Sequence, residues 1–340
     1  MDQSARNIIV TLAKIGLAVA AFAWLLTQID VGEAVALLGR LNATVLAAVL
    51  AVSVLGLLGR FYTWQATAAP IERVSLRGAG SVALVVNFIN QLLPSRLTGR
   101  VAAPFVLRSR LGLSYPDATA VSGVHTALYS VYYGLAASVG LALAFDRLSP
   151  GLILVLALST ALYIAAGVFL LAAGTNLSRL DPLLDWFARL ANRLPRIGAS
   201  VAEQIRGLSA FAETSTDAFR KIALSPGVWL RYAAGWSLTL LVAAGVRVWL
   251  LLGSFGAELE PAVFIPLYLV AAYSVTLLPL TPGGIGVTEA TATAVFVALG
   301  VPGEVIVPIV LIDRAMGIYL PALAGWYPSL HLDLSTLSTE

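Results

Sequence analysis

Several charged side chains stand at breaks in very apolar stretches of this chain. Arg96 and Arg100 belong to LLPSRLTGR (92–100), and Glu289 follows the prolines and glycines of LLPLTPGGIGVTEA (277–290). The planar guanidinium of arginine makes two parallel hydrogen bonds to a phosphate or carboxylate. The N-terminus of a helix adds free N–H groups and a partial positive charge. These residue types predict an anion site where two helices are interrupted.

Other charges lie inside apolar runs, and they complete the predicted substrate-binding set. A charge near the middle of a membrane costs roughly 3 kcal/mol, so each must be paired, hydrated or turned towards a ligand. The predicted substrate-binding residues are Arg96, Arg100, Gly283, Gly284, Gly286, Glu289, Arg60, Arg247, Asp313 and Arg314. The five arginines of this set minus its two acids leave a net charge of +3.

Structural roles are the alternative for several of these charges. Asp313 could pair with Arg314, or Glu289 with an arginine, only to lock helices together. Arg60 and Arg247 fall within a turn or two of expected helix ends, so their side chains could extend to the membrane surface.

Three roles remain open for Glu289. It could complement the dipole of its own helix, release an arginine to an incoming phosphate, or carry a proton that couples transport.

The sequence offers little for catalysis or metal binding. It has no cysteine, and its two histidines are His125 and His331. The embedded acids Glu289 and Asp313 are far apart in sequence, and no nucleotide-binding motif is visible. We therefore expect no catalytic residue, no metal, no cofactor and no nucleic-acid partner, and ATP is not expected to be the direct energy source.

The composition places the chain in a membrane. Of its 340 residues 59% are hydrophobic and 11% are charged, and the mean hydropathy is +0.88. Soluble domains carry about 25% charged residues. The expected fold class is therefore an all-α, polytopic membrane protein.

The apolar runs predict about six full transmembrane helices, since a crossing takes about 20 residues. These runs are 8–26, 43–66, 117–145, 150–173, 226–252 and 304–327. A signal peptide is the alternative for the first run, but its length and the later runs favour a retained span. Shorter runs at 79–93, 101–107, 262–278 and 285–299 form two broken or re-entrant helix hairpins.

The loop charges favour hairpins over full crossings. With a cytoplasmic N-terminus and two hairpins, most loop Lys and Arg fall on the cytoplasmic side, including Arg73, Arg77, Arg108 and Arg110. Among the loop cations, only Arg40 and Arg147 fall outside. This positive-inside bias predicts the cytoplasmic (plasma or inner) membrane, with both termini cytoplasmic.

The two halves share a pattern that predicts inverted repeats. LLP at 92–94 recurs at 277–279, and LGLSYPDA (111–118) is echoed by LGVPGEV (299–305). Inverted repeats with broken helices at the midplane are typical of transporters. We expect one transmembrane domain (1–327), with repeats at about 8–145 and 150–327, and a short cytoplasmic tail (328–340). The polar segment 176–222 is either a set of amphipathic helices on the cytoplasmic leaflet or a connector beneath the bundle.

These motifs resemble a known family. LLPLTPGGIGVTEA, LGVPGE (299–304) and LIDR (311–314) are similar to the C-terminal signature of the lysylphosphatidylglycerol synthase transmembrane region, the flippase-like UPF0104 family. The earlier LLPSRLTGR and LRSRLGLSYPDATA (107–120) resemble its N-terminal signature. The chain departs from that pattern at Arg100, where the family has an acid, which implies a more anionic headgroup. No soluble aminoacyltransferase domain is expected after the last span, so lysyl transfer is not predicted.

The leading hypothesis is a flippase or scramblase for an anionic, phosphate-bearing lipid, either polyprenyl-phosphate-linked or a glycerolipid. An intramembrane glycolipid transferase is disfavoured by the lack of paired acids. A non-catalytic membrane partner of a cell-envelope glycosyltransferase, or a small-solute or ion secondary transporter, remains as an alternative.

Overall fold

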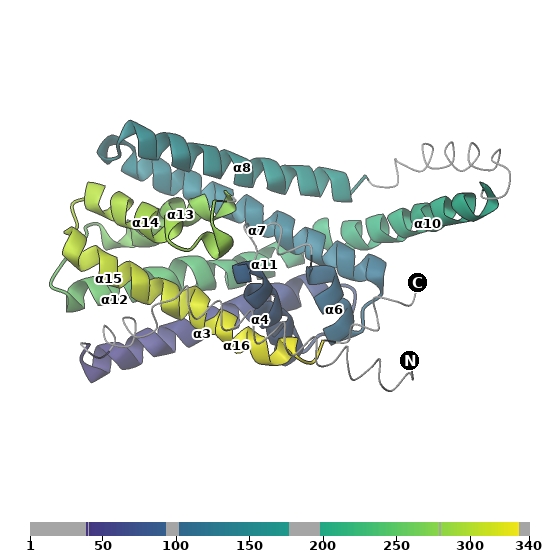
Figure 1. Ribbon diagram of the computed structural model, residues 1–340, viewed down its shortest axis with the longest axis horizontal. Coiled ribbons are helices and arrows are strands. Elements are labelled where there is room, and N and C mark those ends of the chain that lie inside the picture. Colours follow the sequence, from purple (N-terminus) through teal and green to yellow (C-terminus); the bar gives the residue numbers. More distant parts are fainter. Residues whose placement is uncertain (1–38, 40, 93–101, 177–197, 279, 333–340) are drawn as a thin grey trace, which may run out of the picture.

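The computed structural model describes residues 39, 41–92, 102–176, 198–278 and 280–332, and these form helices joined by turns (Figure 1). Five helices are long and apolar enough to cross a membrane: Ala43–Ala68, Tyr115–Arg147, Pro150–Gly174, Pro226–Ser254 and Gly303–Ser329. Each matches a predicted run to within a few residues. The predicted first span, 8–26, lies outside the described residues. The described part is therefore an all-α, multi-pass bundle.

The five spans are built from continuous and composite helices. Three of them are formed by α3 (Ala43–Ala68), α7 (Tyr115–Ala144), which runs into the 3₁₀ turn η1 (Phe145–Arg147), and α8 (Pro150–Gly174). The fourth joins α11 (Pro226–Ser237), η3 (Leu238–Ala243) and α12 (Ala244–Ser254). The fifth joins α15 (Gly303–Arg314), η7 (Ala315–Tyr319) and α16 (Leu320–Ser329). Both η3 and η7 are π-helical, so each composite span has one wide turn near its middle.

Side-chain caps explain where several spans begin. The Asn42 carboxamide accepts a hydrogen bond from the Val45 N–H at 2.9 Å. Ser114 and Ser149 cap α7 and α8 in the same way, and each is followed by a proline within the first helical turn. A polar cap before proline is a common helix start because it satisfies N–H groups that have no partner within the helix.

Glycines let the spans pack closely. A methyl group on Gly140 of α7 would lie 2.0 Å from the Leu267 carbonyl oxygen of α13, and one on Gly325 of α16 would lie 2.1 Å from the Leu84 carbonyl oxygen of α4. On the outside, α8 exposes large apolar side chains such as Leu154 (70%) and Phe169 (69%). Small residues between helices and an apolar exterior are the pattern expected in lipid.

Two pairs of short helices lie between the long spans. The first pair is α4 (Leu76–Leu92) and α6 (Ala103–Leu111). The second is α13 (Ile265–Tyr273), flanked by the 3₁₀ turns η4 (Ala262–Phe264) and η5 (Ser274–Leu277), with α14 (Val287–Ala298). They lie in opposite halves of the bundle in Figure 1.

The two short pairs touch near the middle of the bundle. Gln91, at the end of α4, reaches the η6 turn (Pro282–Gly284) between α13 and α14. A Cβ added at Gly283 would lie only 2.5 Å from Oε1 of Gln91, so the two residues are in close contact. The break between α13 and α14 lies where the Pro/Gly stretch 277–286 predicted an interruption. The re-entrant course of the two pairs remains a prediction. The inverted relation of the two halves remains a prediction.

The charged turns are unevenly distributed between the two ends of the bundle. The ends of α3 and α6 and the starts of α4 and α11 lie together, with Arg73, Arg77, Arg108, Arg110 and Arg231. The opposite end carries Asp146, Arg147, Glu258, Glu260 and Glu304. The bundle thus has one basic end and one mainly acidic end.

Helix α10 (Gly198–Ala223) covers the described part of the polar segment. Its C-terminal part packs on the bundle, where Phe219 and Ile222 are buried and Phe219 contacts Gly174 of α8. The rest of α10 extends beyond the basic end of the bundle in Figure 1. The C-terminal part therefore acts as a packed connector.

Candidate substrate-binding site

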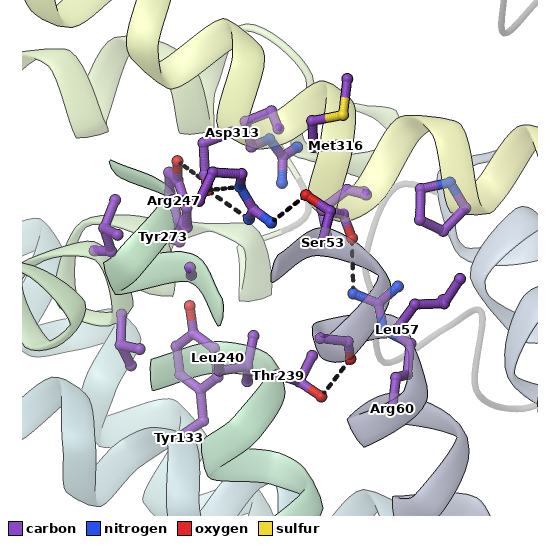
Figure 2. Close-up of a pocket in the computed structure, with 18 residues that line it drawn as sticks. Ser53, Leu57, Arg60, Tyr133, Thr239, Leu240, Arg247, Tyr273, Asp313 and Met316 are labelled. Carbon is purple, nitrogen blue, oxygen red and sulfur yellow. Dashed lines mark hydrogen bonds and ion pairs between the residues drawn. The ribbon is translucent and has the colours of Figure 1, made fainter. Parts of the chain in front are cut away.

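A cavity near the middle of the bundle gathers charged side chains from three spans. Arg60 comes from α3, Arg247 from α12, and Asp313 and Arg314 from the end of α15 (Figure 2). Tyr273, at the end of the short helix α13, completes the polar lining. The cavity volume is about 50 Å³, which is room for a few water molecules.

Arg247 and Asp313 form a buried, fully bonded pair. The Nε of Arg247 donates to Oδ1 of Asp313 at 2.8 Å, and its Nη1 donates to the Ser53 hydroxyl at 3.2 Å. The Tyr273 hydroxyl donates to the second carboxylate oxygen of Asp313 at 2.8 Å. Arg247 is 4% exposed and Asp313 is 3% exposed. A buried pair of this kind holds only when its remaining polar atoms are also bonded.

Arg314, which is buried, forms a second ion pair with Glu289, which is partly buried. Its Nε donates to Oε1 of Glu289 at 2.7 Å, and the Tyr319 hydroxyl donates to the same oxygen. The other carboxylate oxygen accepts the Gly286 N–H at 2.7 Å, so Glu289 also caps α14. Glu289 is therefore both a helix cap and the counter-ion of Arg314.

One guanidinium nitrogen of Arg314 makes no hydrogen bond to a described residue. Its Nη2 donates to the Gly283 carbonyl at 3.4 Å and to the Tyr319 hydroxyl at 3.3 Å. Its Nη1 is buried and has no hydrogen-bond partner among the described residues, although Arg314 as a whole is only 1% exposed. An unsatisfied charged donor in a buried site is costly, and a bound anion would remove that cost.

Arg60 turns towards the centre of the bundle. Its Nη2 donates to the Gly317 carbonyl at 2.8 Å, which links α3 to the π-helical turn η7. The alternative in which Arg60 and Arg247 extend to the membrane surface is wrong. Arg247 is held by Asp313, and Arg60 by a backbone carbonyl of another span.

The suggested pairing of Asp313 with Arg314 is also wrong. Adjacent residues of a helix point in different directions, so Asp313 faces α12 while Arg314 faces α14. The suggested pairing of Glu289 with an arginine is present, and the arginine is Arg314.

The predicted glycines form the break beside this second pair. Gly283, Gly284 and Gly286 have φ values of 61°, 71° and 82°, which other L-residues rarely adopt. This backbone brings the Gly283 carbonyl to Arg314 and the Gly286 N–H to Glu289. The predicted Arg96 and Arg100 lie outside the described residues.

Sequence reasoning missed the polar partners of these charges. Ser53, Tyr273, Tyr319 and the Gly317 carbonyl each bond a charged residue of the site. Tyr319 lies five residues after Arg314, and the two side chains meet across a π-helical turn. The sequence alone does not reveal that turn. A hydroxyl inside an apolar run was the available signal for Ser53 and Tyr273.

Within the described ranges, no group of three or more His, Cys, Asp or Glu side chains lies close enough together to hold a metal ion. The polar centre instead consists of guanidinium, carboxylate and hydroxyl groups. Such a centre can bind an anion and exchange its counter-ions.

The apolar spans and their charged centre define a polytopic membrane protein. Residues 11–325 match the family model described as the lysylphosphatidylglycerol synthase TM region. The chain therefore belongs to this family.

A curated relative supports the same assignment over a short stretch. A UPF0104 membrane protein from Pyrococcus horikoshii is 36% identical over 55 residues, which is 16% of this chain and 16% of the relative. No solved structure matches the chain.

Proposed function

We propose that this protein is a non-catalytic flippase or scramblase that moves an anionic, phosphate-bearing lipid across the cytoplasmic membrane. The observation that carries the proposal is the charge of the central cavity. Among the described lining residues are Arg60, Arg247 and Arg314 and one acid, Asp313. Glu289 pairs with Arg314 from outside the lining, so three arginines face two acids and one positive charge is left over. The Nη1 of Arg314 has no described partner. A buried site with excess positive charge and an unused donor is suited to phosphate.

The lipid phosphate would contact the Nη1 of Arg314 and the guanidinium of Arg60, while the acyl or polyprenyl chains stay in the surrounding bilayer. When no lipid is bound, the two ion pairs keep Arg247 and Arg314 in place, and the Gly317 carbonyl holds Arg60. In the proposed cycle, this cavity of about 50 Å³ would be the state in which the headgroup path is closed. Movement of the short helix pairs against the spans would open it to one leaflet and then to the other.

The family supports the lipid part of the proposal, because its name refers to the membrane region of a phospholipid-modifying protein. The basic and acidic ends support an orientation with the basic end cytoplasmic. With the predicted first span at 8–26, this orientation would make both termini cytoplasmic. The headgroup is either that of a polyprenyl-phosphate-linked lipid or that of a glycerolipid.

A flipping assay tests the proposal. The purified protein is reconstituted into phosphatidylcholine vesicles that contain fluorescent phosphatidic acid, and an impermeant reductant bleaches the outer leaflet. Wild-type protein should make inner-leaflet phosphatidic acid accessible. Arg314→Gln and Arg60→Gln should each slow this by roughly tenfold or more, because each loses charge-assisted hydrogen bonds to the phosphate.

Arg147→Gln is the matched control, since Arg147 is exposed at the acidic end of the bundle. It should flip lipid at the wild-type rate. Equal rates for wild type, Arg314→Gln and Arg60→Gln would show that the central arginines do not bind the phosphate.

A second role is favoured by α10. This helix extends beyond the bundle (Figure 1) and could recruit a cell-envelope glycosyltransferase. Replacing residues 177–210 by a flexible linker leaves the buried Phe219 and Ile222 in place. Loss of transferase recruitment with flipping intact would support this role, and unchanged recruitment would exclude it.

A further inference from the structure

A second cavity adjoins the central one. It lies between α3, α4, α7 and α11, and its volume is about 80 Å³. Arg60, Thr239, Leu240 and Ile318 line both cavities. A group bound in the second cavity would therefore be adjacent to a phosphate bound in the first, with Arg60 between them.

The second cavity differs chemically from the first. Aromatic rings dominate its lining: Trp64 stacks on His125 with centroids 3.7 Å apart, and His125 meets the edge of Tyr232 at 5.3 Å. Asn87 and Asn90 of α4 add carboxamides. Among the described residues that line it, none is acidic and Arg60 alone is an arginine or lysine.

Two residues that line this cavity each carry a buried polar atom that has no described partner. The indole N–H of Trp236 is a donor without an acceptor, and the Trp236 side chain is 3% exposed. The Oδ1 of Asn90 is a buried acceptor without a donor. Unused polar atoms in a buried cavity are costly unless a ligand or water bonds them.

These two atoms restrict what the cavity can hold. A hydrocarbon chain would leave both unsatisfied. An anion would accept from Trp236 but would be repelled by the Asn90 oxygen. A hydroxyl group both donates and accepts, and the carbon face of a hydroxylated ring packs well on aromatic side chains. The volume is suited to one ring rather than to an oligosaccharide.

We infer that the second cavity binds a polyhydroxylated ring, a sugar or a cyclitol, carried by the same headgroup whose phosphate occupies the first cavity. The inference rests on the proposed function, because it takes the phosphate site as given. It narrows the substrate class from anionic lipids to lipids whose phosphate bears such a ring.

Two lipids with identical acyl chains test the two cavities separately. Phosphatidic acid carries the phosphate alone, and phosphatidylinositol adds a hydroxylated ring. Binding of each to the full-length protein in detergent is measured by native mass spectrometry. The wild type should prefer phosphatidylinositol. Trp236→Phe keeps the aromatic ring but removes the N–H, so it should reduce this preference roughly three- to tenfold with phosphatidic acid unaffected.

Asn90→Leu provides an independent variant, because it removes the acceptor from a different helix and should reduce the preference in the same way. Trp249→Phe is the control: Trp249 is 54% exposed and lies outside both cavities. It should leave both affinities unchanged.

The outcomes distinguish this inference from the proposed function. A wild type without preference, or unchanged preference in both cavity variants, would overturn the ring site. If the cavity variants lose affinity for phosphatidic acid and phosphatidylinositol to the same extent, the ring site is overturned as well, since the cavity would then not recognise the ring. If Arg314→Gln binds phosphatidic acid normally while Trp236→Phe loses the preference, the phosphate site is wrong and the ring site stands.

Discussion

The guanidinium Nε of Arg314 lies 2.7 Å from Oε1 of Glu289, and this contact joins a long span to the short helix α14. The same carboxylate caps α14 through the Gly286 N–H. A ligand phosphate that attracts Arg314 therefore competes with the group that also fixes the start of α14. An anion bound at Arg314 would thus be coupled to the position of the helix break through one side chain, Glu289.

Glu289→Gln keeps the shape of the side chain and removes its charge. Breaking a buried ion pair costs about 3–5 kcal/mol because the other charge stays buried, so the unfolding temperature should fall. Added phosphatidic acid should restore more stability to the variant than to the wild type, since the phosphate replaces the lost anion. Thermal unfolding with and without the lipid measures both effects.

Glu304→Gln is the matched control for this experiment, because Glu304 also lies in the first turn of a helix but is exposed. It should change stability by less than about 1 kcal/mol. An unfolding temperature equal to wild type in Glu289→Gln would exclude an ionised role for this residue.

The Arg247–Asp313 pair should show strong coupling. Arg247→Met and Asp313→Asn should each destabilise the protein by about 3 kcal/mol, and the double variant should cost clearly less than their sum. Reversible unfolding in mixed micelles gives the four free energies of the cycle. Glu258→Gln, at an exposed turn, should stay within about 0.5 kcal/mol of wild type. If the losses of unfolding free energy in the two single variants simply add in the double variant, Arg247 and Asp313 do not stabilise each other in the buried site.

Gly325→Ala should separate α16 from α4. The new methyl group would lie 2.1 Å from the Leu84 carbonyl oxygen, and backbone cannot move aside as a flexible side chain can. Overpacking of this kind costs about 1–3 kcal/mol or more. Gly253→Ala is the control: no atom lies within 4 Å of the added methyl group, and alanine favours a helix by up to about 1 kcal/mol. Equal stability of the two variants would contradict the close packing.

The absence of cysteine from the sequence allows a direct test of orientation. Glu72 and Glu258 are both exposed, in turns at the basic and acidic ends of the bundle. With an impermeant maleimide, Glu258→Cys should be labelled in intact cells and Glu72→Cys only after permeabilisation. The reverse pattern would place the basic end outside.

Much of the helical layout could be predicted from the sequence. The runs 43–66, 150–173 and 304–327 correspond to Ala43–Ala68, Pro150–Gly174 and Gly303–Ser329. Such spans are long, apolar and bounded by caps or prolines, and lipid tolerates no other spanning structure for this composition. The Pro/Gly break at 277–286 was equally visible, because it interrupts an otherwise apolar stretch.

The pairing within the site was harder to predict. Which arginine meets Asp313 depends on helix rotation, and a π-helical turn changes that rotation without a clear sequence mark. Ser53 illustrates a second difficulty. Its hydroxyl also donates to the Val49 carbonyl of its own helix, as many serines inside apolar helices do, so its contact with Arg247 could not be distinguished in advance.

The two π-helical turns have a mechanical consequence. A turn with one additional residue weakens the hydrogen-bond ladder and is a common place for a helix to bend. One such turn ends at Ala243, just before Arg247, and the other begins at Ala315, just after Arg314. Each of these spans therefore has a weakened turn near its arginine. Bending at either turn would move an arginine relative to its counter-ion and so change the shape of the cavity.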